Sequence, residues 1–170
     1  MTSEKLADAR VVPDGEAWTL IFIRDLPHPP KAVWAALTDP AEIDRWAPFT
    51  ASRDLAATGD ATLTMVDGDR RDDLPAVVRR ADAPVLLEYT WGEDLLRWEL
   101  EPTGEGTRLT LRHTMTDRDM TAKTAAGWHI CLATMARLLD GADVRAIRGQ
   151  EAMAHGWQEL ADGYTAKIGT

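Results

Sequence analysis

The sequence predicts an α+β fold, in which a curved antiparallel sheet of about six or seven strands surrounds a long C-terminal helix. Two short helices are expected after the first strand, and an extra helix at the C-terminal end. Three observations predict this fold. β-Forming runs joined by turn dipeptides fill the middle of the 170-residue chain, these runs are apolar on one face only, and a later run repeats apolar residues every three or four positions.

The first third of the chain predicts a strand and then two short helices. Residues 1–15 are polar and indicate an arm or a short leading strand, whereas the β-forming run Ala17–Leu26 indicates a full strand. Pro30 can open a helix, which must end before the next proline restricts the backbone. Asp39 can cap a second short helix that runs to Trp46.

The middle of the chain predicts an antiparallel meander. Asp67-Gly68 and Gly92-Glu93 are typical of tight turns, and the short joins leave no room for the crossover helices that parallel strands need. The candidate strands are Ala61–Val66, Pro75–Arg80, Val85–Trp91, Asp94–Glu101 and Thr107–Thr114.

Alternation along the last three strands separates an inner from an outer face. The outer positions are mostly charged, and the inner positions are apolar or aromatic except for one histidine. The inner residues are Leu87, Tyr89, Trp91, Leu96, Trp98, Leu100, Leu109, Leu111 and His113. Because one face of the sheet is apolar, we expect another element to cover it.

Two helices are predicted after the meander. The first, at about Met120–Leu139, would be roughly 30 Å long and could cross the whole sheet. Asp117 or Asp119 can cap its start, and Gly141 can end it in a left-handed conformation. The second is expected at about Glu151–Lys167.

Length and composition indicate one cytoplasmic domain. We expect a single domain over residues 1–170, with a core at about 17–141 and a helical extension at about 142–170, because no linker composition interrupts the chain. The single cysteine cannot form an internal disulfide, which favours a reducing compartment. The polar start lacks a signal-peptide core, and no apolar run approaches the roughly 20 residues of a membrane span.

Charge and residue spacing exclude several kinds of partner. With 19 Lys and Arg against 28 Asp and Glu, the net charge is −9, and nucleic acid is not expected because phosphate contacts need clustered cations. His129 and Cys131 are two positions apart on a helix and face different directions, so they do not make a metal site. We expect no metal and no other cofactor. Carboxylates near Asp67-Gly68-Asp69 could bind calcium, although a solvated turn is the simpler interpretation.

Three separated segments resemble one known family, in the order that the family has them. They are IRDLPHPPKAVWAALTDPAEIDRW at residues 23–46, LRWELEPTGEGTRLTLRHT at residues 96–114 and TAAGWHICLATMARLLDG at residues 124–141. The first resembles the opening segment of START-like (SRPBCC) proteins, specifically the activator of heat-shock protein 90 ATPase homologue-like family. The other two resemble the last hairpin and the last helix of these proteins.

The resemblance covers about Ala17–Gly141 and implies a helix-grip fold, in which the sheet grips the helix around a cavity that often holds an apolar ligand. Such superfamilies include lipid carriers, polyketide cyclases, hormone receptors and chaperone activators, so the fold alone does not assign a function. The family has no universal catalytic residue that could be carried over, and we assign none.

Tryptophan content points to this cavity. The chain has seven Trp against two Phe and two Tyr, and Trp fills a small tight core poorly. The alternative is a filled core without room for a ligand. The residues predicted to bind the ligand are Trp46, Phe49, Tyr89, Trp91, Trp98, His113, Trp128, Cys131 and Met135.

His113 is the sharpest single candidate, because it interrupts an apolar row and can act as an acid, a base or a hydrogen-bond donor. The alternative is that it lies at the strand end and bonds a backbone carbonyl, since no nucleophile and carboxylate accompany it at a recognisable spacing. Cys131 is interpreted as a small buried hydrophobe rather than a nucleophile.

Three functions remain open from the sequence. The first is binding of an apolar or aromatic small molecule in the cavity. The second is a protein-interaction or chaperone-activator-like role, which requires an exposed apolar stripe at Trp157, Leu160 and Tyr164, although that stripe could also pack on the core or form a homodimer. The third is a cyclase-like or hydrolase-like enzyme, which requires a second polar group beside His113.

Overall fold

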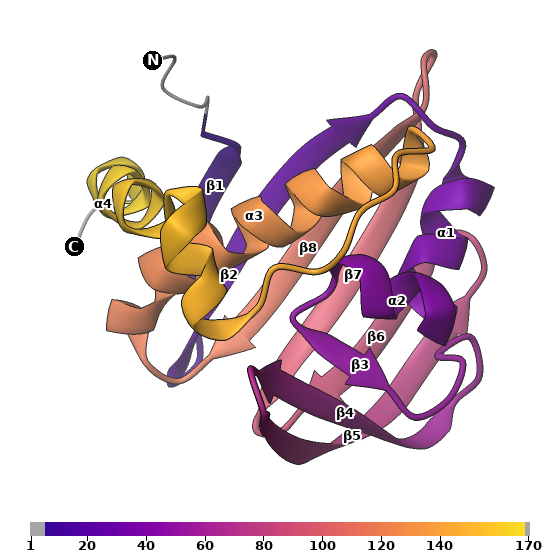
Figure 1. Cartoon of the computed structure of the whole chain (residues 1–170), viewed down its shortest axis with the longest axis horizontal. Helices are drawn as coiled ribbons and strands as arrows, with labels where there is room; N and C mark the ends of the chain where they lie inside the picture. Colours follow the sequence, from indigo (N-terminus) through magenta and orange to yellow (C-terminus); the bar gives the residue numbers. More distant parts are fainter. Residues whose placement is uncertain (1–5, 169–170) are drawn as a thin grey trace.

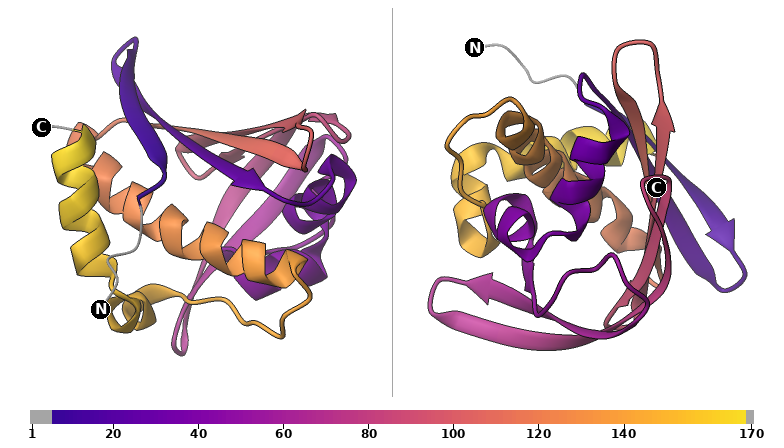
Figure 2. Two further views of the ribbon diagram at one scale, coloured as in Figure 1. Left: turned by 90° about the horizontal axis from the view of Figure 1, so that it is seen from above. Right: turned by 90° about the vertical axis from the view of Figure 1, so that its right-hand side faces the viewer.

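The computed structural model describes residues 6–168 and consists of one bent sheet with the helices on one side of it (Figure 1). Eight antiparallel strands are ordered β1-β2-β8-β7-β6-β5-β4-β3. Figure 2 shows that the β4–β5 end of the sheet turns away from the β1–β2 end, and that the helices lie on the concave side. The strands are β1 (Asp8–Asp14), β2 (Ala17–Leu26), β3 (Phe49–Ala51), β4 (Gly59–Asp67), β5 (Arg70–Asp82), β6 (Leu86–Trp91), β7 (Asp94–Pro102) and β8 (Thr107–Met115). The α-helices are α1 (Pro30–Thr38), α2 (Pro40–Trp46), α3 (Thr121–Leu139) and α4 (Trp157–Ile168).

The α+β class and the grip of the sheet on α3 are confirmed. The sheet has eight strands, where the sequence predicts about six or seven. Part of the 1–15 segment forms the leading strand β1, which pairs with β2, while residues 1–5 lie outside the described residues. The other addition, β3, has only three residues, too few to show a period, and it pairs with β4.

The two short helices form as predicted, and local chemistry explains their bounds. Pro30 is the first residue of α1, where its missing N–H leaves no bond unmade. Asp39 Oδ1 accepts a hydrogen bond from the N–H of Ala41 at 3.0 Å, which caps α2. The stacked pair α1–α2 closes one end of the concave side (Figure 1).

Helix α3 crosses the concave side of the sheet and ends at Leu139, and Gly141 just beyond it, with φ of 89°, is the predicted left-handed stop. Its start differs slightly from the expectation. Asp117 caps a short 3₁₀ turn, η1 (Arg118–Met120), by accepting from the N–H of Asp119 at 2.9 Å, and α3 follows directly.

The prediction of one continuous last helix at Glu151–Lys167 is wrong. A 3₁₀ segment, η2 (Gly149–His155), and α4 replace it, separated by Gly156 with φ of 83°. A positive φ at this glycine cannot be part of a right-handed helix, so the chain turns there before α4 begins.

The predicted faces of the meander are confirmed. The inner residues of β6, β7 and β8 are buried, except that Trp91 at the strand end is half-buried. On the outer face Arg97 contacts Glu88 at 3.2 Å and Glu99 at 2.9 Å, and Arg112 contacts Glu99 at 3.0 Å. Burial alone would raise the pKa of the Glu99 carboxyl, but the hydrogen bonds from Arg112 and Arg97 outweigh it and lower that pKa.

Helix α4 packs on the core through the stripe that the interaction hypothesis needed to be exposed. Leu160 and Tyr164 are buried, and Trp157 is half-buried. The Tyr164 hydroxyl lies 2.7 Å from His129 Nδ1 on α3 and accepts from the N–H of Ala7 at 2.9 Å. Within residues 6–168 no helix is long and apolar enough to cross a membrane.

Candidate functional site

A partly open pocket of about 530 Å³ lies between α3 and the bent sheet, at the end where β6 meets β7. Its walls come from β4 and β5, from the ends of β6, β7 and β8, from one face of α3, and from the segment that joins α3 to α4. The apolar and aromatic lining residues are Pro48, Met65, Val66, Trp91, Trp128, Ile130, Cys131, Ile147, Ala152 and Trp157. The polar ones are Asp67, Arg70, Asp72, Asp94, His113, Thr124 and Arg148, and Gly127 and Gly149 complete the wall.

Four of the nine predicted ligand-binding residues line this pocket, namely Trp91, His113, Trp128 and Cys131. The other five lie in the packed core rather than in the pocket wall, and each is no more than 2% exposed. They are Trp46, Phe49, Tyr89, Trp98 and Met135.

The core under the pocket is filled by interlocking aromatic rings. Trp98 meets Trp46 edge-on at 6.0 Å and Trp128 edge-on at 5.3 Å. The indole N–H of Trp98 donates to the Tyr89 hydroxyl at 3.1 Å, and that of Trp46 donates to the carbonyl of Ala36 at 2.8 Å. Edge-to-face geometry and satisfied N–H groups let several indoles pack densely, so these rings fill the central space and the pocket lies at one end of it.

His113 connects the sheet to α3 through both ring nitrogens. The Trp128 indole N–H donates to Nδ1 at 3.0 Å, and Nε2 lies 2.7 Å from Asp94 Oδ2. Because Nδ1 accepts a hydrogen bond, it carries no proton, and the ring proton is assigned to Nε2. Nε2 therefore donates to the Asp94 carboxylate. His113 is 2% exposed, and its partners are side chains, not the backbone carbonyl that the sequence left as an alternative.

Trp91 lines the pocket beside His113. Its ring centroid lies 5.8 Å from that of His113, 6.0 Å from that of Trp128 and 5.0 Å from that of Phe49. Its buried indole N–H has no acceptor among the described residues. A buried donor without a partner costs roughly 1–3 kcal/mol, so a bound molecule with an acceptor there would be favoured.

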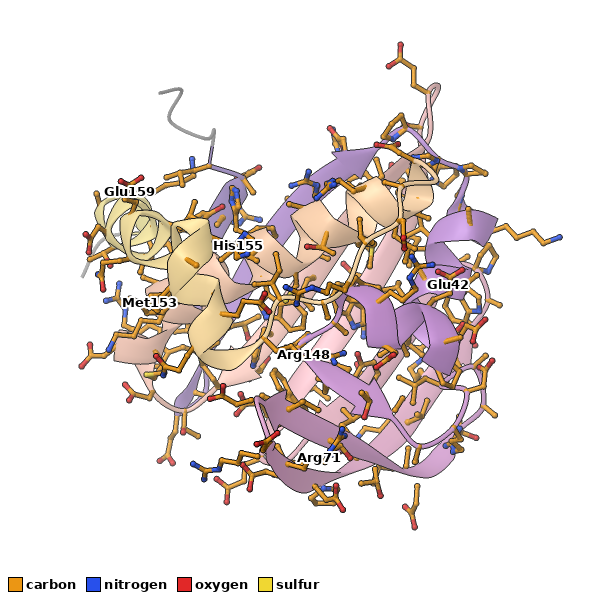
Figure 3. The ribbon with its side chains drawn as sticks, viewed as in Figure 1. Glu42, Arg71, Arg148, Met153, His155 and Glu159 are labelled. Atoms are coloured by element: carbon orange, nitrogen blue, oxygen red, sulfur yellow. The ribbon has the colours of Figure 1, made fainter. Side chains whose placement is uncertain are left out.

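Ile147, Arg148, Gly149 and Ala152, from the segment that joins α3 to α4, line the pocket. Arg148, labelled in Figure 3, connects this segment to α2 and β3. Its guanidinium donates to the carbonyls of Ala47 at 2.9 Å, Asp44 at 3.0 Å and Phe49 at 3.2 Å. Burial lowers the pKa of Arg148, although Asp44 opposes the shift. The Arg148 guanidinium therefore has a structural role, because it connects the segment after α3 to the backbone of α2 and β3.

Sequence reasoning missed the contributions of Trp157 and Asp94 to the pocket. Hydrophobic periodicity predicts Trp157 on a separate tail helix, because the positive φ of Gly156, where the chain turns, leaves no trace in that periodicity. Asp94 carried a usable signal, since it is two residues before Leu96 on the same strand and therefore shares its inner face.

Cys131 is 5% exposed, and burial raises the pKa of its thiol from 9.0 to about 12. We expect this shift to make stability fall at alkaline pH. Between about pH 9 and 12 the thiol is ionised in the unfolded chain but protonated in the folded protein, so the unfolded state binds fewer protons and the free energy of unfolding decreases as pH rises. The loss attributable to this thiol is about 1.4 kcal/mol between pH 8 and 10.

Urea unfolding of the native sequence and of Cys131→Ala at pH 8 and pH 10 measures this loss. Burial also raises the pKa of Tyr89, so both proteins lose some stability, but the native sequence should lose more. An equal loss in both proteins would show that the thiol contributes nothing.

Among residues 6–168, no three His, Cys, Asp or Glu side chains are grouped so that they could hold a metal ion. Two carboxylates in and beside the β4–β5 turn have partners within the protein. Asp72 pairs with Arg70 at 3.1 Å, and Asp67 accepts from the N–H of Gln150 at 3.3 Å.

The bent sheet, the gripped helix and the pocket at one end define a START-like (SRPBCC) protein. Residues 27–140 match the family described as "Activator of Hsp90 ATPase homolog 1-like protein". Since the match spans well over half of the chain, the chain belongs to this family. The matched region ends before the segment between α3 and α4 that lines the pocket. A search of the curated proteins finds no match.

Solved structures show the same fold. CalU16 from Micromonospora echinospora superposes with a TM-score of 0.70 at 24% identity, covering 100% of both chains. The conserved protein of unknown function EF2215 from Enterococcus faecalis has a TM-score of 0.69 at 16% identity, covering 94% of this chain and 89% of its own. The AHSA1-like protein from Aeromonas hydrophila has a TM-score of 0.61 at 20% identity and covers 72% of this chain and 92% of its own.

Proposed function

We propose that the protein binds an apolar or aromatic small molecule in the pocket at the β6–β7 end of α3. The observation that carries this proposal is the pocket itself, about 530 Å³ in volume and walled by Trp91, Trp128 and Trp157 beside a core that is otherwise filled. Small-molecule sites typically measure roughly 300–1,000 Å³ and combine apolar walls with a few polar groups. The polar groups here include Asp94 and His113 at the ends of β7 and β8.

Two features favour binding over the alternatives. Asp94 is the second polar group that the enzyme hypothesis requires beside His113. Both ring nitrogens of His113 already have partners, however, so the ring has no free nitrogen to take a proton from a bound molecule as a hydrolase or cyclase would require. Leu160 and Tyr164 are buried against α3, so the α4 stripe is not an exposed surface for a partner protein.

Binding of Nile red, an uncharged apolar dye, tests the proposal. We expect a micromolar dissociation constant with quenching of Trp emission, because three indoles surround the pocket. Gly127→Leu provides the blocking variant, since a Cβ at Gly127 meets no atom within 4 Å and the new side chain would occupy the pocket. Leucine also favours a helix interior over glycine by roughly 0.5–1 kcal/mol, so the variant should fold.

The matched control is Lys123→Leu, which adds the same side chain to an exposed position of the same helix. Dye affinity should fall at least about 30-fold in Gly127→Leu, because the side chain and the dye compete for the same space, and stay unchanged in Lys123→Leu. Equal affinity in both variants, or no binding by the native sequence, would overturn the proposal.

We also propose that the chain is one domain in a cytoplasmic protein, and that any oligomer it forms is a homodimer. Buried residues from β1 to α4 belong to one hydrophobic cluster, which supports a single domain. The lone cysteine supports a reducing compartment. Native mass spectrometry of the protein purified from its own host would report a retained ligand and the stoichiometry together.

A further inference from the structure

Asp94 lines the pocket, and its carboxylate has no cationic partner among the described residues. Its side chain is 35% exposed, and Oδ2 accepts from His113 Nε2 at 2.7 Å. No hydrogen bond within the described part of the chain uses Oδ1. The Trp128–His113–Asp94 chain fixes the carboxylate in position, and because Nδ1 of His113 accepts from Trp128, the ring nitrogen that faces Asp94 is the one that carries the proton.

The two arginines of the pocket wall already have partners. Arg70 lies against Asp72 at 3.1 Å, and Arg148 directs its donors at backbone carbonyls of α2 and β3. Asp67 accepts a backbone N–H of η2. Asp67 and Asp94 are thus both without a cationic partner among the described residues, but Asp67 is exposed, whereas His113 holds Asp94 beside the Trp rings. The net charge of −9 adds a field that attracts cations.

The surfaces beside Asp94 suit a cation with an apolar body. Trp91 and Trp128 lie within ring contact of each other and of His113. Indole faces attract cations, and they do so more strongly where water is partly excluded. An anion in this place would face the Asp94 carboxylate and would be repelled.

We propose that the pocket selects ligands that carry a protonated amine on an apolar or aromatic body, with the ammonium group paired to Asp94. This inference rests on the proposed function, because it names the chemical class of ligand for the same pocket. Asp94 is the specificity-determining residue, and His113 is a positioning residue that orients it through Nε2.

Three probes share the same kind of apolar body and differ in the charge of their end group, so their affinities show the effect of that charge. They are 4-phenylbutylamine, 4-phenylbutan-1-ol and 4-phenylbutanoate. We expect calorimetric titration to give the amine at least about tenfold higher affinity than the alcohol, as a partly buried charged hydrogen bond provides, and the carboxylate the lowest affinity. Asp94→Asn should bring the amine within about twofold of the alcohol, because an Asn oxygen can still accept from His113 while the charge is lost.

The matched control is Glu105→Gln, which removes one negative charge from an exposed residue in the β7–β8 turn, at the opposite end of these strands from Asp94. It should leave the amine preference intact. A preference that survives Asp94→Asn, or the absence of any preference in the native sequence, overturns the inference.

Gly127→Leu distinguishes failure of this inference from failure of the proposed function. If all three probes bind equally and Gly127→Leu abolishes their binding, the pocket is a binding site without amine selectivity. If none of the probes binds, or if the Leu side chain has no effect, the pocket proposal and the amine inference both fail.

Discussion

Replacing Trp98 with alanine is expected to lower the free energy of unfolding by about 3–5 kcal/mol, a large part of the total stability of a domain of this size. The side chain is 0% exposed, and its ring contacts those of Trp46 and Trp128 edge-on. Its removal leaves a cavity in the centre of the core and deprives the Tyr89 hydroxyl of its hydrogen-bond donor. Rigid neighbouring rings cannot collapse far into that cavity.

Urea unfolding followed by far-UV circular dichroism measures this loss without using the deleted fluorophore. The matched control is Trp18→Ala, because Trp18 is half-buried on β2 and its ring faces the Arg118 guanidinium at 5.3 Å. It should cost about 1 kcal/mol, as a partly exposed cation–π contact does. If the two variants unfold at the same urea concentration, the aromatic core is not the packed unit that the geometry indicates.

The inner face of the meander could be predicted from sequence because strand geometry is local. Successive side chains alternate between faces, so Leu109, Leu111 and His113 had to share one, and all three are buried. The same rule, continued backward from Leu96, places Asp94 on the inner face. The register opposes Leu96 to His113, so Asp94 and His113 are diagonal neighbours on that face, and their contact was available from the hairpin pattern.

The division between pocket and filled core could not be predicted in this way. Trp98 and Trp91 belong to the same inner surface, yet one is fully enclosed and the other lines the pocket. What separates them is the tertiary position of α2, β3 and the segment after Gly141, held by the bonds of Arg148 to backbone carbonyls. Long-range contacts of this kind leave no periodic signal in the sequence.

Gly106→Ala is expected to destabilise the protein by about 3 kcal/mol, at the upper end of the usual cost of overpacking. A Cβ at this position would lie 2.0 Å from the carbonyl oxygen of Leu26 and 2.6 Å from the backbone nitrogen of His28. Both atoms belong to the backbone at the junction of β2 and α1, so no side-chain rotation can relieve the clash. The start of β8 must therefore separate from β2, which also strains the hydrogen bond from Thr107 Oγ1 to the His28 carbonyl at 2.7 Å.

Gly104→Ala is the matched control in the same turn, because a Cβ there meets no atom within 4 Å and the backbone does not require a positive φ. Its free energy of unfolding should change by no more than about 0.5 kcal/mol, as for most exposed substitutions. Urea unfolding of the two variants thus compares the same added methyl group in and out of contact with β2. Equal midpoints would mean that the β7–β8 turn can shift away from β2 without loss, and that the close approach at Gly106 does not fix the position of α1.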